Sequence, residues 1–481
     1  MKHRLIILVL FYFLNVQYGI AQYTQVPDPN FEQALIDLGV DSEGILDGQF
    51  LTTDAIGVGT LNLDQKNIFD LTGIEAFVDL DQLFAADNII NSIDLTLLPS
   101  DLWTLNLSRN NLSSIDLSPI SEVVNLYLNQ NNFTEIDASN LTNVFILEVA
   151  KQSLNWLNLT NCTNLFFLTC FETSIETIDL TTCSNLNAFE GYDASFTSLD
   201  FSGNIEIEEI KVYNNPLTNI NLPNNPDLGY LVLDDTLLTE LDITHCPGLV
   251  EISFFNTPLN HINFSNNPLI EKIQGNKSSL ATINVDNNPN LEWLILRNNN
   301  IEGSLSFYNN PNLDVVILDE NLIQEVDFSS NPLLTIIDVD DNPNLEFVNI
   351  QNGANENIIG FSAHDCPNLS CVVVDDPNVA NNNIFIDANT TLVGSVEECE
   401  NLAINEEMLQ LQISIYPNPA QDILNIESQQ PIETVKIYNL QGQLIKEDSS
   451  SRIVVSSLST GMYFVQVTID GQSSTKQFIK E

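Results

Sequence analysis

The sequence predicts a mainly-β solenoid with strands on both flanks, a short helical cap ahead of it, and a separate antiparallel β-sandwich at the C-terminal end. Three observations predict this organisation. Apolar residues recur every 21 or 22 residues through most of the chain, an amphipathic helical pattern precedes them, and the composition changes after Cys399. One turn of such a coil cannot bury its own apolar face, so the array is stable only as a stack.

The repeats occupy residues 58–375, and each unit reads roughly L-x-x-L-x-L-x-x-N-x-L-x-x-I-D-L-x-x-N-x-x. The L-x-L and I-x-L pairs have a period of two, which predicts a short strand on each of two flanks. Stacked turns place equivalent residues about 4.8 Å apart. Successive units begin at Val58, Leu80, Leu102, Val123, Val144, Leu165, Leu186, Ile207, Leu228, Leu249, Ile270, Leu291, Leu313 and Leu334.

Two polar columns, 10 residues apart within each unit, are also expected to point inward. An Asn at a tight bend can bond backbone groups that no strand partner satisfies. The first column holds Asn88, Asn110, Asn131, Asn215, Asn299, Asn321 and Asn342. The second holds Asn204, Asn225, Asn267, Asn288 and Asn331. Each turn is therefore two similar halves, which predicts few helices and weak curvature.

This pattern resembles the leucine-rich-repeat family, and it is most similar to bacterial internalin-like arrays. The resemblance covers residues 58–375 and implies a leucine-rich-repeat solenoid, without specifying a ligand. The chain departs from the family in the strand-like second half of each turn, which argues against a strongly curved horseshoe.

Both ends of the solenoid need covers to shield the core and the strand edges. Residues 22–57 form the expected N-terminal cap, in which Asp28 precedes a helix that begins at Pro29. Residues 376–399 form the expected C-terminal cap. There we expect Cys371, which faces outward by its alternation with Val372, to form a disulfide with Cys399.

Four other cysteines replace inward Asn or Leu residues, so we interpret them as buried thiols: Cys162, Cys170, Cys183 and Cys246. A bond between Cys162 and Cys183, on neighbouring turns, is an open alternative. A zinc site is not expected, because no Cys-x-x-Cys pair or nearby His accompanies the cysteines.

Residues 1–21 have the pattern of a signal peptide. A basic start is followed by an apolar run from Leu5 to Leu14 and by the small-residue site Gly19-Ile20-Ala21. A membrane anchor is the alternative, but the apolar run is too short to span a bilayer. No later segment is long and apolar enough to cross a membrane.

The 481-residue chain has 14 basic and 65 acidic residues, which give a formal net charge of −51. Nucleic acid is excluded as a partner, because phosphate binding needs clustered Lys and Arg. Anionic membrane surfaces are disfavoured for the same reason.

Residues 400–412 are polar and lack the repeat register, so they are interpreted as a linker. Residues 413–481 contain six expected strands, at 423–427, 432–439, 442–447, 452–456, 461–468 and 475–480. Together they predict a small antiparallel sandwich.

This segment resembles the type A C-terminal sorting domain of type IX secretion substrates. The resemblance rests on Tyr-Pro-Asn-Pro-Ala from residue 416, Ile-Tyr-Asn-Leu-Gln-Gly from residue 437, Leu-Ser-Thr-Gly-Met-Tyr from residue 458, and two late lysines. It implies export by the type IX machinery across the outer membrane of a Gram-negative bacterium, followed by attachment or release. An ordinary sugar- or protein-binding β-domain is the alternative. The motif residues are Tyr416, Pro417, Asn418, Pro419, Gly442, Gly461, Lys476 and Lys480.

No catalytic constellation is present, so we do not expect an enzyme. The scattered His residues have no metal-ligand spacing, and there is no Gly-x-Ser-x-Gly elbow. The outward positions of the first strand carry aromatic residues, which favour contact with an extracellular protein or glycan. Ordinary cross-strand stabilisation is the alternative. These ligand-binding candidates are Tyr127, Phe167, Phe171, Tyr192, Tyr213, Tyr230, Phe255 and Trp293.

A second outward column is acidic or amide in nature and could bind calcium between adjacent turns. The alternative is a hydrated face, and no other cofactor is expected. Its members are Asp94, Asp116, Asp137, Asn158, Asp179, Asp200, Asn221, Asp242, Asn263, Asn284, Asp327 and Asn349. The sequence as a whole predicts an exported surface module for adhesion or binding, with a structural surface protein lacking a specific ligand as the alternative.

Overall fold

The computed structural model describes residues 22–481 except 379–382, 410–412, 429, 441 and 470–471. The predicted signal peptide, residues 1–21, therefore lies outside the described residues. The chain folds into two compact units. The first contains the residues up to Glu302 together with Asn309–Asn321, and the second contains Gly303–Tyr308 and Leu322–Glu481.

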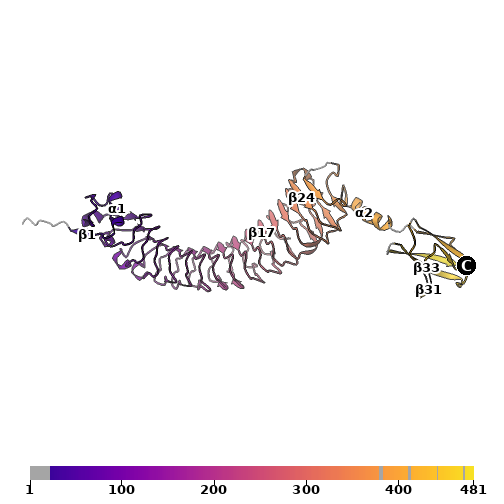
Figure 1. Ribbon diagram of the computed structural model, residues 1–481, viewed down its shortest axis with the longest axis horizontal. Coiled ribbons are helices and arrows are strands. Elements are labelled where there is room, and N and C mark those ends of the chain that lie inside the picture. Colours follow the sequence, from indigo (N-terminus) through magenta and orange to yellow (C-terminus); the bar gives the residue numbers. More distant parts are fainter. Residues whose placement is uncertain (1–21, 379–382, 410–412, 429, 441, 470–471) are drawn as a thin grey trace, which may run out of the picture. The chain divides into compact units, whose positions relative to one another are not determined.

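The first unit is a stack of coils whose short strands pair in parallel, each with its equivalent one turn away (Figure 1). We call this the long sheet. Leu168, for example, pairs with Leu147 on one side and with Phe189 on the other. Its strands are β3 (Thr60–Asn62), β4 (Gln82–Phe84), β5 (Thr104–Asn106), β6 (Asn125–Tyr127), β8 (Ile146–Glu148), β10 (Phe167–Thr169), β11 (Ala188–Glu190), β13 (Glu209–Lys211), β15 (Tyr230–Val232), β16 (Glu251–Ser253), β17 (Lys272–Gln274), β18 (Trp293–Ile295) and β20 (Val315–Ile317).

Strands also form on the second flank of the first unit, but only in some turns. In the other turns this flank has no strand and is bordered by isolated backbone bonds, such as Thr197 N–H to Glu176 O at 3.2 Å. Short 3-10 helices occupy this region in the early turns. The paired strands are β7 (Glu135–Asp137) with β9 (Trp156–Asn158), and β12 (Ser198–Asp200) with β14 (Asn219–Asn221). The 3-10 helices of the early chain are η1 (Thr52–Ala55), η2 (Ile74–Ala76), η3 (Leu95–Leu97) and η4 (Ser118–Ile120).

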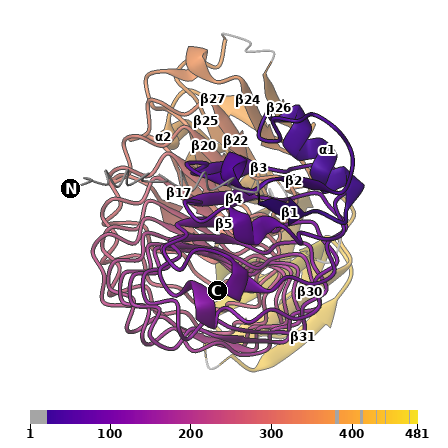
Figure 2. The ribbon, with the colours of Figure 1, turned by 90° about the vertical axis from the view of Figure 1, so that its left-hand side faces the viewer.

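The apolar columns of the repeat form the core, as the sequence predicts. In the unit that begins at Leu102, the side chains of Leu102, Leu105, Leu107 and Leu112 are all buried. Burying a Leu or Phe side chain stabilises the fold by roughly 1.5–3 kcal/mol. Every turn adds several such residues, and Figure 2 shows the coils one behind another from the N-terminal side.

The inward Asn columns satisfy backbone groups at the bends, also as predicted. The side-chain amide of Asn110 donates to Ala85 O at 2.9 Å and Leu107 O at 3.0 Å, and its oxygen accepts from Ile90 N–H at 3.0 Å. In the first column, the residue before each Asn has a positive φ, as Arg109 does with 56°. The left-handed residue reverses the chain after the strand, and the buried amide fixes that reversal.

The N-terminal cap confirms the predicted helix, α1 (Pro29–Asp37), with Asp28 as its N-cap. Asp28 accepts from Asn30 N–H at 2.8 Å and also from two backbone N–H groups of the first coil, including Phe69 at 2.6 Å. Strand β1 (Tyr23–Gln25) pairs with β2 (Gln49–Leu51) in antiparallel fashion beside this helix (Figure 1). One buried carboxylate therefore joins the cap to the solenoid.

In the second unit the coils continue beyond residue 375, where the sequence predicts the repeats to end. The first flank has β22 (Ile336–Asp338), β24 (Gly360–Ala363) and β26 (Ile384–Ile386), and β26 lies within the segment predicted as a cap. Equivalent residues are 24 apart between β22 and β24 and 23 apart between β24 and β26, instead of 21 or 22, so the repeat pattern does not predict this last coil. The second flank has β19 (Glu302–Ser306), β21 (Leu322–Asp327), β23 (Phe347–Asn349), β25 (Cys371–Val373) and β27 (Thr391–Val393), with the 3-10 helix η5 (Asn355–Asn357) between coils.

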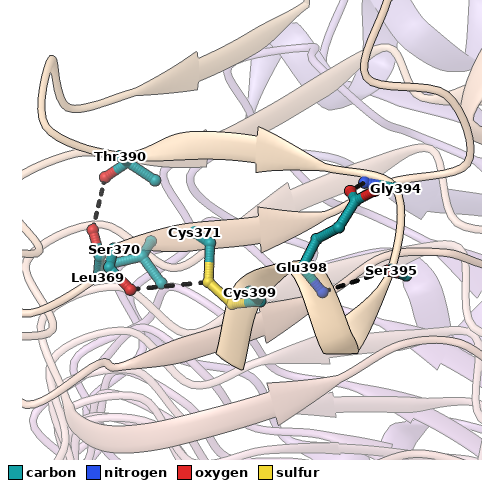
Figure 3. The surroundings of a disulfide bond; sticks show 8 residues. All are labelled: Leu369, Ser370, Cys371, Thr390, Gly394, Ser395, Glu398 and Cys399. Atoms are coloured by element: carbon teal, nitrogen blue, oxygen red, sulfur yellow. Dashed lines mark hydrogen bonds between the residues drawn. A yellow bond between two sulfur atoms is a disulfide. The ribbon is translucent and has the colours of Figure 1, made fainter. Parts of the chain in front are cut away.

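Helix α2 (Val396–Leu409) covers the outer side of β25. The predicted disulfide between Cys371 and Cys399 is confirmed, with 5.7 Å between the two Cα atoms, and it joins β25 to α2 (Figure 3). Cys371 does point away from the coil core, but it is buried because α2 packs over it and Val373.

The stretch 400–412, which the sequence predicts to be a linker, is helical as far as Leu409. Among the described residues no helix is long and apolar enough to span a membrane. The remaining five cysteines are free and buried, including Cys162 and Cys183, so the alternative bond between these two is not formed.

The C-terminal segment forms the predicted antiparallel sandwich. Its three-stranded sheet has the order β28-β29-β32, and its four-stranded sheet has the order β31-β30-β33-β34. The first strand was not among the six that the sequence predicts. The strands are β28 (Ile413–Tyr416), β29 (Ile423–Ser428), β30 (Thr434–Asn439), β31 (Leu444–Asp448), β32 (Arg452–Val454), β33 (Gly461–Ile469) and β34 (Gln472–Lys480).

Candidate functional site

Three of the predicted aromatic residues form one stack on the outer face of the long sheet. Phe171, Tyr192 and Tyr213 each occupy the seventh letter of their repeat, just after β10, β11 and β13. We call them the aromatic row. Phe171 and Tyr192 lie with ring centroids 4.4 Å apart, and Tyr192 and Tyr213 have the same separation. The planes of each pair are within 9° of parallel, so each ring covers the face of the next.

Charged side chains surround the aromatic row. The Lys151 ammonium lies 5.7 Å from the centre of the Phe171 ring. Lys211 forms ion pairs with Glu190 at 3.2 Å and Glu209 at 2.6 Å. Burial, with a further contribution from the neighbouring Tyr213, raises the pKa of Tyr192 to about 12. The row therefore combines partly desolvated rings with charges of both signs.

The other predicted aromatic residues lie outside this stack. Phe255 occupies the same letter two turns beyond Tyr213, and its ring has the Lys277 ammonium 5.4 Å from its centre. Trp293 similarly contacts Lys272, at 5.0 Å. Tyr230 is 48% exposed and stands apart from them. Tyr127 and Phe167 are half-buried at other letters of the repeat.

A second ring stack was missed by the sequence interpretation. Phe145 and Phe166 lie with centroids 4.7 Å apart and planes 9° from parallel. Both occupy the second letter of the repeat, outside the three columns that the sequence predicts to bind a ligand. Trp103, at the same letter two turns earlier, is 52% exposed. The recurrence of Trp103, Phe145 and Phe166 in one register is the signal that could have found them.

The few basic residues of the repeats all lie on or beside the outer face of the long sheet. Between residues 58 and 375, every Lys and Arg lies at a letter of the repeat that faces this sheet's outer surface or its adjoining bend. They are Lys66, Arg109, Lys151, Lys211, Lys272, Lys277 and Arg297. The rest of the solenoid surface is acidic or neutral, so this face is chemically distinct.

The second outward column has a structural role in turns. Asp179 accepts from the N–H of Thr181 at 2.9 Å and from its hydroxyl at 2.6 Å. These bonds hold the pKa of Asp179 below its usual value. Asp94, Asp200 and Asp242 make equivalent bonds to the residue two positions on. Within the described part of the chain, no group of three or more His, Cys, Asp or Glu side chains is placed to hold a metal ion.

The predicted sorting motif joins the two ends of the sandwich. The side chain of Asn418 donates to Gln477 O at 3.1 Å and accepts from Ile479 N–H at 2.8 Å, both on β34. Ala420 N–H also donates to Ile479 O at 2.8 Å. The Pro-Asn-Pro-Ala segment thus lies along the edge of the last strand. Tyr416 and Lys476 are exposed, whereas Lys480 is buried.

The two glycines of the motif lie at chain reversals. Gly442 has a φ of 75°, which an L side chain rarely adopts, and its N–H donates to Asn439 O at 3.0 Å. Gly461 begins β33, and the Tyr463 hydroxyl, two residues later, donates to Ser459 O at 3.0 Å. Gly442 and Gly461 therefore allow two of the turns, and Asn418 binds the closing edge of this domain.

Comparison with known proteins supports both halves of this architecture. Residues 414–481 match the secretion system C-terminal sorting domain. Among solved structures, the functional domain of internalin J from Listeria monocytogenes superimposes with a TM-score of 0.63 at 18% identity, covering 96% of this chain and 99% of that one. That domain is described as including a cysteine ladder. A search of curated proteins finds no match.

Two further structures have similar folds. Internalin F from Listeria monocytogenes gives a TM-score of 0.51 at 16% identity, over 71% of this chain and 95% of that one. A leucine-rich-repeat protein from Leptospira interrogans gives 0.50 at 15% identity, over 73% of this chain and 95% of that one. At these identities the likeness concerns the fold alone.

The coils have the same kind of fold as internalin-type leucine-rich-repeat structures, and the C-terminal segment marks the chain as an exported protein. Its C-terminal segment belongs to the secretion system C-terminal sorting domains, which mark proteins sent by type IX secretion to the cell surface or the extracellular space. The protein is therefore located outside the cell or on its surface.

Proposed function

We propose that this protein is a cell-surface binding or adhesion module that recognises an extracellular protein through the aromatic row. The main support for this proposal is the continuous stack of Phe171, Tyr192 and Tyr213 on the outer face of the long sheet. Export places this face where it can meet an extracellular partner. Partly exposed Tyr residues supply large contact areas at low cost in side-chain entropy.

The orientation of the rings favours a protein over a glycan as the partner. A sugar packs on an aromatic residue through the open face of the ring. Here the inner faces of Phe171 and Tyr213 and both faces of Tyr192 are covered by neighbouring rings, and the Lys151 ammonium lies over the Phe171 ring. The row therefore offers ring edges and Tyr hydroxyls. Such edges contact apolar and polar groups of a protein surface.

The ion pairs beside the row also suit a protein partner. Lys211 with Glu190 and Glu209, and Lys151 with Glu172 at 3.4 Å, supply charges of both signs within a short distance. Each exposed ion pair stabilises the fold by only about 0–1 kcal/mol. Breaking such a pair when a partner binds therefore costs little free energy. A charged rim around an aromatic centre is the arrangement found in protein interfaces.

Replacement of the whole aromatic row tests the proposal. The mature protein and its variant with Phe171→Ser, Tyr192→Ser and Tyr213→Ser would be compared on arrays of extracellular proteins and glycans. We expect the variant to lose at least tenfold in affinity for any protein partner, because central aromatic residues dominate binding energy. The matched control is Trp156→Ser, since Trp156 is 48% exposed on the second flank.

Unchanged circular dichroism in both variants would establish that the folds are intact. Retained binding by the triple variant would refute this site. An array without hits for the mature protein would instead favour a structural surface protein, and a hit confined to glycans would contradict the argument from ring orientation.

A further inference from the structure

A separate groove runs along the opposite edge of the long sheet, at the beginnings of its strands. Its volume is about 730 Å³. Residues at the second position of five successive repeat units line this groove. Glu206 contributes a further carboxylate to the lining. We call it the edge groove, and the side chains that define it are Val124, Phe145, Phe166, Asn187, Glu206 and Glu208.

One half of the edge groove is apolar and open to solvent. Phe145 and Phe166 stack on each other but remain 41% and 37% exposed. Trp103, one turn before Val124 in the same column, is 52% exposed. Exposed aromatic residues on neighbouring turns make a continuous apolar strip, which is unfavourable in water unless a partner covers it.

The other half of the groove is anionic. Glu206 and Glu208 stand beyond Asn187, and no Lys or Arg is among the described residues that line the groove. Two of the lining amides donate within the chain, Asn164 to Thr142 O at 2.9 Å and Asn187 to Glu206 O at 3.1 Å. The two carboxylates carry the only formal charges of the described groove lining, so this half is suited to a cationic group with several donors.

The backbone along the groove is not available to a partner strand. The N–H groups of Phe166 and Phe167 both donate to Phe145 O, at 2.9 and 3.0 Å. Asn187 and Ala188 repeat this arrangement one turn later with Phe166 O. A partner must consequently bind through its side chains.

We propose that the edge groove binds an extended segment of another protein that carries an apolar side chain followed by Lys or Arg. The apolar side chain lies against Phe145 and Phe166, and the cation faces Glu206 and Glu208. Phe166 and Glu208 are two turns apart, or about 10 Å at the spacing of parallel strands. An extended chain covers that distance in about three residues.

Charge complementarity selects this occupant over the alternatives. An acidic segment would be repelled by the two carboxylates. A neutral glycan would find the inner faces of the two stacked Phe rings covered, as in the aromatic row. Only a segment with both an apolar and a cationic side chain satisfies the two halves of the groove together.

Two labelled synthetic decapeptides test this inference on the full mature chain. The first carries Phe-Leu followed three residues later by Arg-Arg, and the second has Glu-Glu in place of the arginines. Fluorescence anisotropy should show the Arg peptide binding at least tenfold more tightly, with a loss of affinity as salt is raised. Equal binding of the two peptides, or no binding of either, would overturn the proposal.

Variants locate the binding. Glu206→Gln with Glu208→Gln should weaken the Arg peptide at least tenfold, and Phe145→Ser with Phe166→Ser should do the same. Glu271→Gln with Glu292→Gln is the matched control, because these residues occupy the second letter on later turns outside the groove. Equal loss in the control, or displacement of the peptide by a neutral glycan, would contradict the assignment. The triple variant of the aromatic row should bind the Arg peptide normally.

Discussion

Tyr192 lies face to face with Tyr213, with ring centroids 4.4 Å apart and planes 7° from parallel. The two rings follow strands β11 and β13, which pair residue for residue with a 21-residue offset. The same register places Phe171 on the other face of Tyr192. The repeat therefore converts a sequence period into a stack of side chains. Desolvation within that stack is the largest cause of the raised pKa of Tyr192.

The first prediction concerns alkaline pH. The pKa of Tyr192 is about 12 in the folded protein, whereas that of an unfolded Tyr is about 10. Its contribution to stability is thus complete below pH about 10 and is lost as the pH rises toward 12. In Tyr192→Phe, the urea concentration at the unfolding midpoint should decrease less between pH about 10 and 12 than it does in the native protein. Tyr308→Phe, at a 62% exposed site, is the control, and an equal effect of both would contradict the prediction.

The second prediction concerns the inward amides. Asn110→Leu removes the donors to Ala85 O and Leu107 O and the acceptor for Ile90 N–H. Leaving buried polar groups unpaired costs about 1–3 kcal/mol each, so we expect a loss of several kcal/mol in the free energy of unfolding. Asn110→Thr should be milder, because Thr236 occupies the equivalent site and donates to Leu233 O at 2.9 Å. Urea denaturation measures both, and equal losses would argue against this role.

The third prediction concerns calcium. The carboxylate of Asp179 already accepts two hydrogen bonds from Thr181, and the turn is complete without a metal ion. We therefore expect the melting temperature to be the same in EDTA and in calcium. Asp179→Asn should preserve stability, because Asn158 makes the same bonds with Thr160, whereas Asp179→Ala should lower it. A higher melting temperature in calcium that is lost in Asp179→Asn would restore the calcium hypothesis.

Most of the fold could be predicted from the sequence because one register repeats. The positions of Leu105 in the core and Asn110 at the bend follow from the same column in every turn. Helix α2 could not be predicted, since it lies outside the repeat and has an acidic start at Glu397 and Glu398 without a clear apolar stripe. The outward position of Cys371 and its bond to Cys399 could be predicted, but its burial beneath α2 could not.

The candidate site was only partly predictable for a different reason. A period fixes which residues share a column, and it brought Phe171, Tyr192 and Tyr213 together correctly. It does not tell which outward letters remain open to solvent. Phe145 and Phe166 belong to a column just before the strand, so the alternation of strand residues does not predict that they stack.

The fourth prediction concerns close packing between two turns. A Cβ atom at Gly248 would lie 1.8 Å from Pro226 O, which is far inside van der Waals contact. Gly248→Ala should therefore force the two turns apart and destabilise the protein by at least about 1–3 kcal/mol, the usual range for overpacking. At Gly229 the nearest atom would be 3.9 Å away, so Gly229→Ala should be tolerated. Urea denaturation of the two variants measures this difference. An unchanged unfolding midpoint for Gly248→Ala would contradict the steric argument.

The last prediction concerns the C-terminal cap, where the disulfide joins Cys371 in β25 to Cys399 in α2 across 28 residues of sequence. Closing a loop of this size restricts the unfolded chain and stabilises the folded one by about 2–4 kcal/mol. Replacement of both cysteines by Ser should remove that stabilisation and expose Val373, which α2 covers. Hydrogen exchange should then rise in α2 and β25, while the N-terminal cap around α1 stays protected.

A reducing agent separates this effect from the substitutions themselves. The other described cysteines are free, and burial raises the pKa of the Cys162 thiol to about 12 and that of Cys183 to about 11, which leaves them unreactive. Reduction should therefore destabilise the native protein and leave the double Ser variant unchanged. If reduction altered both proteins equally, the stabilisation of the cap would have to come from packing of α2 alone, because the covalent link would then contribute nothing.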